Sequence, residues 1–558
     1  DWSSDVCSSD LLLRKIRTNG FAQTMEEAAY TWFNRFAALR FMEVNGYIPS
    51  RVRIFTDDYG KFRPQILTEA ANVNINGLDR SRVYALKEES RDEELFRYLF
   101  ITQCNDLSEV LPGMFQKIAD WTELLLPDEL LREGNIPERM IALIPEDDWR
   151  DQVQIIGWLY QYYNTELKNK VFADLKRNIK IDRNTIPPAT QLFTPDWIVR
   201  YMVQNSLGRL WLEGHDNSTL RQSWQYYVDE AEQSPEVIAQ LGHIRRELSE
   251  LKPEDIRCID PCCGSGHILA VMFDVLTQIY EDYGYSAREA AQFIVGRNIW
   301  GLDIDDRAAQ LAYFTVMMKA RQYDRRFFTR GIQPNIYAIH EANGYEVQIM
   351  SRMFDMFNDF IDAKEYGSIL KAEDRDYSGL REYLLANIKE NLSLLRPEGV
   401  DEAMHITRQA EALSQKYHVV VTNPPYMGSS GMGAKLSEFV RKNYPDSKSD
   451  LFAVFIERLG CMVRLGGYQA MITQQAFMFL SSYEKLRAKM MKSQDTVNMI
   501  HLGARAFEEI GGEVVQTVSF VLQNCRTRGR KGVYVRLVDP AGQKAKEDMF
   551  LSGANRYT

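Results

Sequence analysis

The chain has 558 residues, of which 45% are hydrophobic and 26% charged, and its formal net charge is −10. This composition is typical of globular proteins and excludes disordered, collagen-like and uniformly basic, nucleic-acid-coating classes. The sequence contains no run of 18 apolar residues, and its seven cysteines form no CxxC pair. We therefore expect a soluble cytoplasmic protein with no disulfide framework and no metal site.

The two ends of the chain differ from the rest of the sequence. Residues 1–11 read DWSSDVCSSDL, which lacks the basic start and the apolar centre of a signal peptide. We interpret this stretch as a non-native leader. Residues 541–558 close no recognisable element, and we interpret them as the start of a connector to a missing C-terminal target-recognition region.

Residues 12–185 are predicted to form an all-helical domain. A helix is expected to begin at Thr24 as its N-cap and to end at Asn45-Gly46, and a second helix is expected over residues 154–176. Aromatic residues are frequent here, and at helical spacing they favour a packed core over stacking on bases. Pro187-Pro188 follows this domain closely and favours a boundary.

Residues 186–540 have a different sequence pattern, in which short β-rich runs alternate with helical segments. This alternation predicts an α/β fold with a doubly wound, mostly parallel sheet whose ligands bind at the carboxyl ends of the strands. The runs are CID at 258–260, NIWGLDI at 298–304, NIYAIH at 335–340, YHVVVTN at 417–423, GYQAMIT at 467–473 and QTVSFVL at 516–522.

The first β-rich run leads into a glycine loop, Asp260-Pro261-Cys262-Cys263-Gly264-Ser265-Gly266. Its two glycines let the backbone approach a ligand, and the helix that follows offers unpaired N–H groups. A tight turn would use the same glycines, so this pattern alone is weak. Asp303, at the end of the second run, can accept both hydroxyls of a ribose. Because it lies 37 residues after Gly266, a nicotinamide dinucleotide is disfavoured.

The more specific pattern is Asn423-Pro424-Pro425-Tyr426, at the end of a β-branched strand. The two prolines fix the backbone and remove two N–H donors, which leaves the Asn423 side-chain oxygen and the main-chain carbonyls as acceptors. Such acceptors can hold a planar NH₂ group and draw its lone pair out of conjugation, so that the nitrogen can attack a methyl sulfonium. Tyr426 can stack on a flipped base. A rigid proline turn with Asn423 as a helix cap is the plainer alternative, and the glycine loop and Asp303 disfavour it.

In this order, DPCCGSGHIL, GLDID and NPPY resemble motifs I, II and IV of the amino-methyltransferases that use S-adenosylmethionine and modify adenine N6 or cytosine N4. The segment Phe193-Thr194-Pro195 is similar to motif X of this family, and the order of motifs resembles its gamma arrangement. The resemblance implies a Rossmann-like catalytic domain over 186–540, with S-adenosylmethionine as the cofactor. It further implies the catalytic residues Asn423, Pro424, Pro425 and Tyr426 and the cofactor-binding residues Phe193, Thr194, Pro195, Asp260, Pro261, Gly264, Gly266 and Asp303.

The predicted helical domain, which we call the helical front, and the segment that follows it resemble a narrower group of methyltransferases. TMEEAAYTWFNRFAALRFMEVNGYIPS and NTIPPATQLFTPDWIVRYMVQNSLGRLWLE are similar to segments of the methyltransferases of BREX phage-defence systems. This similarity implies a bacterial enzyme that methylates N6 of an adenine flipped from double-stranded DNA. It also implies other phage-defence proteins as partners.

Three other functions stay open. Cytosine N4 is also an exocyclic NH₂ group, and physics alone does not separate it from adenine N6. A protein glutamine amide suits the same acceptors, although glutamine N5-methyltransferases are usually small and lack a large helical front. A non-catalytic scaffold that senses S-adenosylmethionine and binds DNA would retain the glycine loop, but the intact Asp303 and Asn423 to Tyr426 disfavour it.

A cluster of basic residues lies between two strand-like runs, at Arg526, Arg528, Arg530 and Lys531. A hairpin tip that carries four cations could contact phosphates near the active cleft. A solvated turn is the favoured interpretation, because charge clusters at loop tips are common.

Overall fold

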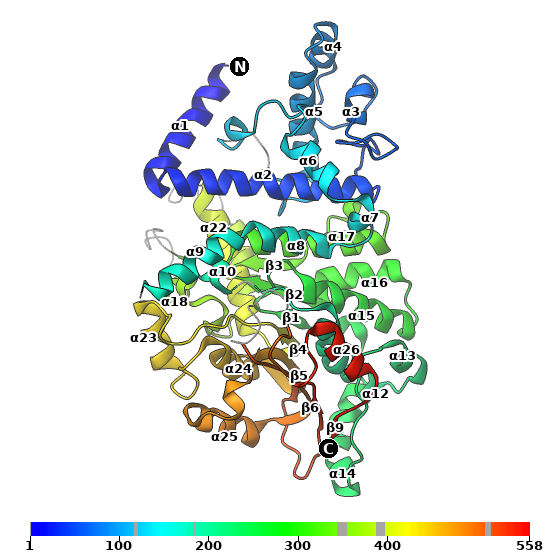
Figure 1. Cartoon of the computed structure of the whole chain (residues 1–558), viewed down its shortest axis with the longest axis vertical. Helices are drawn as coiled ribbons and strands as arrows, with labels where there is room; N and C mark the ends of the chain where they lie inside the picture. The colour runs from blue at the N-terminus through cyan, green and yellow to red at the C-terminus, as the bar shows by residue number, and fades with distance from the viewer. Residues whose placement is uncertain are drawn as a thin grey trace. The chain divides into compact units, whose positions relative to one another are not determined.

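The structure is a computed structural model that describes residues 2–116, 121–177, 179–181, 185–190, 192–342, 354–386, 397–507 and 515–558 (Figure 1). It divides into two compact units. Unit 1 comprises Asp1–Leu159 and Tyr313–Ile332, and unit 2 comprises Tyr160–Ala312 and Gln333–Thr558. The boundary between the units falls before the predicted domain boundary at 185, which stays a prediction. No helix in the described ranges is long and apolar enough to span a membrane.

Unit 1 consists of helices and loops in its described residues. Residues 2–11, predicted to be a leader, lie within the first helix. The helices are α1 (Trp2–Asn19), α2 (Phe21–Val44), α3 (Gln65–Thr68), α4 (Arg80–Glu88), α5 (Asp92–Leu107), α6 (Ile136–Leu143) and α7 (Glu146–Trp149), together with most of α8 (Gln154–Tyr163) and the end of α17 (Asp306–Tyr323).

The long helix α2 begins earlier than predicted. Gly20 is its N-cap, with φ of +85°, and Thr24 lies inside the helix, where its hydroxyl donates to the Gly20 carbonyl at 2.9 Å. The prediction of Thr24 as the N-cap is therefore wrong, because the helix continues upstream to Phe21. The end of the helix is as predicted, with Asn45 as the C-cap and Gly46 in a left-handed conformation.

Aromatic side chains form the core of unit 1. Trp32, Phe36, Phe55 and Phe100 are buried, and the rings of Phe36 and Phe100 stack with centroids 5.1 Å apart. The prediction that aromatics of this region are core residues is confirmed for Trp32 and Phe36. Tyr162, from the same predicted helical domain, belongs to unit 2 and is 66% exposed, so it is not a core residue.

The predicted helix over 154–176 is two helices, α8 and α9 (Thr165–Lys176). The break falls at Asn164, the residue before the first turn of α9. Both halves keep the expected apolar spacing, so the sequence pattern predicts the helical state and not the interruption.

Unit 2 is built on one nine-stranded sheet with the order β3-β2-β1-β4-β5-β7-β6-β8-β9. All six predicted β-rich runs are strands, and β6, β8 and β9 were not predicted. The strands are β1 (Cys258–Asp260), β2 (Ile299–Asp303), β3 (Asn335–Ala338), β4 (Tyr417–Thr422), β5 (Val463–Gln474), β6 (Asp495–Gly503), β7 (Thr517–Gln523), β8 (Val533–Arg536) and β9 (Arg556–Tyr557).

The first five strands in the order, β3 to β5, are parallel, and β7 runs antiparallel to both β5 and β6. The order reverses between β1 and β4, which pair directly, with Cys258 opposite Val419. Such a switch point opens a crevice at the carboxyl ends of the two strands. The prediction of a doubly wound, mostly parallel α/β fold is confirmed.

All six residues of β4 and all seven of β7 are buried. Side chains alternate between the two faces of a strand, so this burial indicates that both faces of the sheet are covered. The helices that lie in unit 2 besides α9 are α10 (Ile186–Thr190), α11 (Asp196–Val203), α12 (Arg209–Gly214), α13 (Ser218–Ser223), α14 (Pro235–Ser249), α15 (His267–Tyr283), α16 (Ala287–Phe293), α18 (Phe354–Asp359), α19 (Ala363–Tyr366), α20 (Tyr377–Ala386), α22 (Pro397–Ser414), α23 (Ala434–Asn443), α24 (Leu451–Met462), α25 (Glu484–Ser493) and α26 (Gln543–Leu551).

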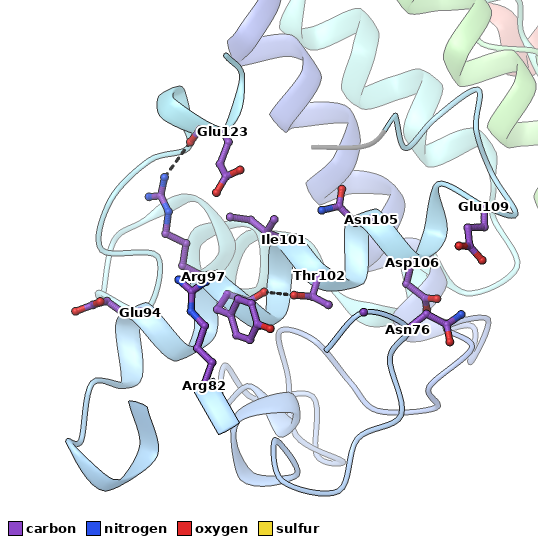
Figure 2. Close-up of a pocket in the computed structure, with 12 residues that line it drawn as sticks. Asn76, Arg82, Glu94, Arg97, Ile101, Thr102, Asn105, Asp106, Glu109 and Glu123 are labelled. Carbon is purple, nitrogen blue, oxygen red and sulfur yellow. Dashed lines mark hydrogen bonds between the residues drawn. The ribbon is translucent and has the colours of Figure 1, made fainter. Parts of the chain in front are cut away.

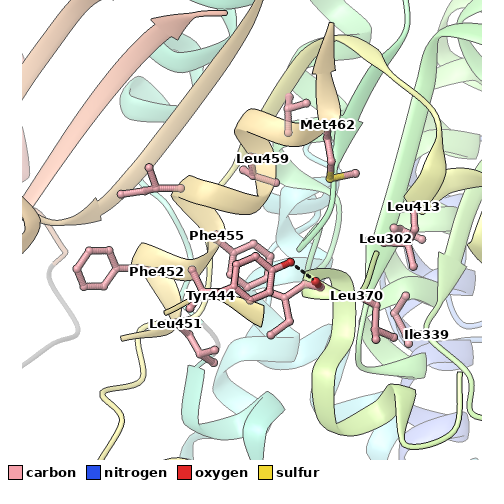
Figure 3. Packing of buried hydrophobic residues seen from close by; sticks show 14 of the residues in the cluster. Leu302, Ile339, Leu370, Leu413, Tyr444, Leu451, Phe452, Phe455, Leu459 and Met462 are labelled. Carbon is pink, nitrogen blue, oxygen red and sulfur yellow. Dashed lines mark hydrogen bonds between the residues drawn. The ribbon is translucent and has the colours of Figure 1, made fainter. Parts of the chain in front are cut away.

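A large apolar cluster fixes α24 beside the sheet. Figure 3 shows Leu451, Phe455 and Leu459 of α24 in this cluster together with Leu302 of β2. Asp450 caps the helix by accepting from the Phe452 N–H at 3.3 Å. The position of α24 is relevant to the site because its N-cap Asp450 also accepts from the Met427 N–H, in the loop after β4, at 3.0 Å.

A long connection between β3 and β4 returns to the glycine loop. The Ser368 hydroxyl donates to the Pro261 carbonyl, and the buried Arg458 of α24 donates to the carbonyls of Ser368 and Leu370 at 3.3 and 3.0 Å. The Tyr444 hydroxyl bonds to the Ile369 carbonyl nearby (Figure 3). These bonds hold residues 368–370 against the end of β1.

Candidate active site

Asp260 joins the two strands at the switch point. It is the last residue of β1, and its Oδ1 accepts hydrogen bonds from the Thr422 hydroxyl at the end of β4, at 2.7 Å, and from the Cys262 N–H at 3.1 Å. Burial raises the pKa of Asp260 to about 7. Its Oδ2 is buried and has no hydrogen-bond partner within the described ranges.

The two glycines of the loop meet different demands. Gly266 has φ of +87°, and a Cβ there would lie 2.9 Å from the Ala312 Cα of α17. Gly264 has φ of +52°, and a Cβ there would meet nothing within 4 Å. Gly266 is therefore required by packing as well as by conformation, whereas the space beside Gly264 is open to a ligand.

Asp303 lies at the end of β2 and faces the loop. Its Oδ2 accepts from the Gly264 N–H at 2.8 Å, and its Oδ1 accepts from the Asp305 N–H at 2.9 Å. Each carboxylate oxygen can accept a second hydrogen bond, so two ribose hydroxyls can still be bound. Burial raises the pKa of this carboxyl to about 6.

The segment Phe193-Thr194-Pro195 contacts Asn423, the first residue of the Asn-Pro-Pro-Tyr turn after β4. The Asn423 Nδ2 donates to the Thr194 hydroxyl oxygen at 3.1 Å and to the Leu192 carbonyl at 3.3 Å. Thr194 and Pro195 are buried, and Pro195 immediately precedes α11. Residues 229 and 231 positions apart in the sequence are thus brought together, as the order of motifs predicts only in outline.

The side-chain amide of Asn423 has one end occupied and one end available. A backbone carbonyl can only accept, so the contact with Leu192 identifies Nδ2 as the end that is held. The Asn423 Oδ1 is buried and has no hydrogen-bond partner in the part of the chain that is described. A buried acceptor without a donor is costly, and its presence at the end of a strand favours a ligand that supplies the donor.

Pro424 and Pro425 lead to Tyr426, which is half-buried. The Tyr426 hydroxyl donates to the Ile472 carbonyl of β5 at 3.1 Å, and its ring meets Phe452 edge to face, with centroids 6.4 Å apart. The next residue, Met427, donates its N–H to Asp450 Oδ1 at 3.0 Å. The Asn-Pro-Pro-Tyr turn is therefore held at both sides, by β5 and by the N-cap of α24.

His267 is a site residue that the sequence analysis missed. It is the first residue of α15, its Nε2 lies 3.2 Å from Asp196 Oδ1, and its ring stacks on Phe193 at 4.6 Å. Against the effect of burial, the bonds from His267 and Arg200 lower the pKa of Asp196 to about 2. A carboxylate only accepts, so the hydrogen is on Nε2, and the buried Nδ1 has no partner among the described residues. Its position after Gly266 is the signal that could have identified it.

The basic cluster lies at the other edge of the sheet. Asp495, the first residue of β6, pairs with Arg526 at 2.9 Å and lies 3.7 Å from Arg530. Since β6 is parallel to β5, this is the amino edge of the strands, opposite to Asn423. The Arg530 side chain is 1% exposed. The prediction that this hairpin contacts phosphates near the active cleft is wrong, because one cation is buried among acids and the tip points to the wrong edge.

Two other features of the described residues bear on the site. No group of three or more His, Cys, Asp and Glu side chains there could hold a metal ion. Unit 1 contains a separate pocket of about 590 Å³ along α5, in which Arg82 lies over the Tyr98 ring and Arg97 donates to the Glu123 carbonyl (Figure 2). None of the predicted site residues lines this pocket.

Residues 297–507 match the family described as Eco57I restriction-modification methylase. The chain is also 39% identical over 97% of its length to the adenine-specific methyltransferase BrxX of Escherichia coli O9:H4 (strain HS), and 42% identical over 96% to the adenine-specific methyltransferase PglX of Lacticaseibacillus casei (strain Zhang). It covers 47% and 46% of these relatives, so it spans about half their length.

Among solved structures, the chain resembles the type IIL restriction-modification enzyme MmeI in complex with DNA, at 12% identity and a TM-score of 0.42, over 90% of this chain and 58% of that one. The sequence identities to BrxX and PglX extend through both the helical front and the motifs of the sheet. Over the residues that it spans, the chain is similar in sequence to the adenine-specific methyltransferases BrxX and PglX.

Proposed function

We propose that this protein transfers a methyl group from S-adenosylmethionine to N6 of an adenine flipped out of double-stranded DNA, and that it marks host DNA in a BREX-type phage-defence system. The observation that carries the proposal is the amide of Asn423. Its nitrogen is held by Leu192 and Thr194, while its oxygen is buried without a donor at the carboxyl end of β4.

The residues around the glycine loop fit the cofactor. The Asp303 carboxylate has one acceptor position left on each oxygen for the ribose hydroxyls, and the space beside Gly264 is open. The unpartnered His267 Nδ1 can accept from the methionyl ammonium group, because its other nitrogen is held by Asp196. When bound, S-adenosylmethionine would supply a methyl group on a positively charged sulfur.

Asn423 and Tyr426 would prepare the base. The Asn423 Oδ1 accepts from the amino group, together with a main-chain carbonyl of the Pro-Pro turn, and the two acceptors draw the nitrogen lone pair out of the ring. The nitrogen would then take the methyl group that the bound cofactor supplies, the cofactor would be left as a neutral thioether, and the proton lost from N6 would pass to water. Tyr426, fixed by Ile472 and Phe452, stacks on the flipped base.

The choice of adenine over cytosine rests on the identity to BrxX and PglX, because both bases offer an NH₂ group. The same similarity supports a DNA substrate over a protein glutamine. The unpartnered Asn423 oxygen favours an enzyme over a scaffold, since a scaffold needs no acceptor at this position. Duplex DNA and other phage-defence proteins are the proposed partners.

The experiment uses the full-length protein, labelled S-adenosylmethionine and genomic DNA that lacks adenine methylation, followed by nucleoside analysis. We expect labelled N6-methyladenine. Asn423→Ala should lower the transfer rate by about 100-fold or more and leave cofactor affinity nearly unchanged, because one positioned polar group in a transition state commonly contributes that much.

Asp303→Ala is the matched variant with the opposite signature. It should weaken cofactor binding by about tenfold or more in calorimetry, because it removes charge-assisted hydrogen bonds. Labelled N4-methylcytosine or labelled protein instead of DNA would overturn the substrate. Wild-type transfer by Asn423→Ala would overturn the acceptor mechanism.

A further inference from the structure

A short loop beyond the active-site strands exposes two large apolar side chains. β5 ends at Gln474, a turn of 3-10 helix follows at Gln475–Met478, and Phe479 and Leu480 are 64% and 54% exposed. The loop leaves the same strand whose Ile472 carbonyl holds the Tyr426 hydroxyl. It therefore begins at the carboxyl edge of the sheet, beside the Asn-Pro-Pro-Tyr turn.

The exposed pair is held in place. The Arg487 Nη1 donates to the carbonyls of Phe477 and Leu480, both at 2.7 Å. Phe477 is buried against Phe452, with ring centroids 6.5 Å apart, and Phe452 is the same ring that contacts Tyr426. A continuous set of rings thus connects Tyr426 to the loop, and the apolar pair is presented from a fixed backbone.

The helix after this loop is locally basic. α25 carries Lys485, Arg487, Lys489 and Lys492 against Glu484, a net charge of 4 − 1 = +3 in a protein of −10. Lys485, Lys489 and Lys492 are spaced i, i+4 and i+7, so they share one face of the helix. Lys489 pairs with Glu457 of α24 at 2.6 Å, so Lys485 and Lys492 are the cations that this face offers to a ligand. Lys485 and Lys492 are exposed, and within the described residues neither forms an ion pair.

We propose that the lysine face of α25 contacts DNA phosphates and that Phe479 and Leu480 enter the base stack next to the flipped adenine. The inference rests on the proposed function and adds the surface that opens the duplex. Apolar side chains inserted between base steps unstack them, and lysines nearby neutralise the phosphates. The basic hairpin around Arg528 is excluded from this role because it lies at the amino edge of the sheet.

The structure offers a matched control for each part of the surface. Leu465 is an exposed apolar residue, 77% exposed, at the amino edge of β5. Arg528 and Lys531 are two exposed cations of the hairpin at the same edge. Leu465→Ala tests whether removing any exposed apolar side chain has the same effect. The double variant Arg528→Gln with Lys531→Gln tests whether removing any two exposed positive charges has the same effect.

The experiment uses the full-length protein and a duplex that contains a site methylated by the wild type, identified by sequencing, with 2-aminopurine in place of the target adenine. Phe479→Ala with Leu480→Ala should reduce the fluorescence increase on binding and the methylation of normal duplex by at least about tenfold. A mismatch opposite the target should restore most of the loss, since that base needs less unstacking. Leu465→Ala should behave as wild type.

Salt dependence tests the lysine face. Lys485→Gln with Lys492→Gln should lower the slope of log affinity against log salt by about 1.8, at about 0.9 for each phosphate contact, while the hairpin double variant leaves it unchanged. Wild-type flipping by the apolar double variant, or no rescue by the mismatch, would overturn the wedge. A change of the salt slope in the hairpin double variant alone would show that α25 does not contact the phosphates. Protection of residues 475–483 from hydrogen exchange in the absence of DNA would show that other parts of the protein cover this loop, and would also contradict the proposed DNA contact. Failure of the wild type to methylate DNA would instead overturn the proposed function.

Discussion

Asp260 is the buried carboxyl that depends most on its surroundings. It accepts from Thr422 and Cys262 through one oxygen, and the other oxygen has no partner in the described chain. Its pKa of about 7 lies above the value of about 3.9 for an exposed aspartate. The folded state therefore keeps a proton on Asp260 that the unfolded state has already lost.

This difference predicts how stability depends on pH. The contribution of Asp260 is fully present below about pH 4 and is lost as pH rises to about 7. Asp260→Asn keeps the acceptor for Thr422 and Cys262 and cannot ionise, so its free energy of unfolding should exceed that of the wild type at pH 8 by up to about 4 kcal/mol, and equal it at pH 4.

Urea unfolding of the protein without cofactor, at pH 4 to 8, measures both curves. Asp303 titrates in both proteins and cancels to first order. A variant less stable than the wild type at pH 8 would contradict the assignment of a protonated, desolvated Asp260.

At the scale of residues, the sequence predicts which side chains have the required chemistry better than it predicts which residues they contact. Asn423 and Asp303 follow from patterns with a chemical reason. The bond from Asn423 to Thr194 does not, because it joins residues 229 positions apart, and no local pattern reports such a pair. His267 was missed because a histidine at a helix start is unremarkable until its stacking on Phe193 and its bond to Asp196 are seen.

At the scale of elements, the glycine loop depends on its two glycines unequally. Gly266→Ala should destabilise the protein by about 2 to 5 kcal/mol, because left-handed strain is added to overpacking against Ala312. Gly264→Ala should cost only about 1 to 2 kcal/mol of strain, since its Cβ meets no atom within 4 Å.

Denaturant unfolding and cofactor calorimetry on both variants check this difference. Gly264→Ala should fold well and show its effect mainly in cofactor affinity, because its side chain occupies the open space beside Asp303. Equal losses of stability in the two variants would show that the close approach to Ala312 is not what requires Gly266.

The elements that were predicted are those with buried, β-branched or long periodic patterns. β6 (Asp495–Gly503) was missed although it is a central strand, since its DTVNMIHLG mixes polar residues into both faces. The basic hairpin was placed at the wrong edge because strand direction is a property of the sheet. Only the antiparallel pairing of β7 with β5 shows that the turn after β7 lies away from Asn423.

At the scale of the whole molecule, the chain contains the predicted catalytic residues and about half the length of BrxX and PglX. We expect the 558-residue chain by itself to bind duplex DNA weakly, with little sequence preference and a log–log salt slope of about −2 to −4, because phosphate contacts of α25 dominate. Gel shifts between 50 and 200 mM salt on unrelated duplexes test this, and tight, sequence-selective binding would contradict it.

The bond between Asp260 and Thr422 also determines when the glycine loop can fold during translation. The two residues are 162 positions apart, and at about 5 to 20 residues per second a ribosome needs roughly 10 to 30 s to pass from one to the other. During this interval β1 has no β4 to pair with, and the Pro261 carbonyl waits for Ser368, 107 positions away. The glycine loop is among the first parts of the sheet to be translated and is completed only after the strand that ends in Asn423 emerges.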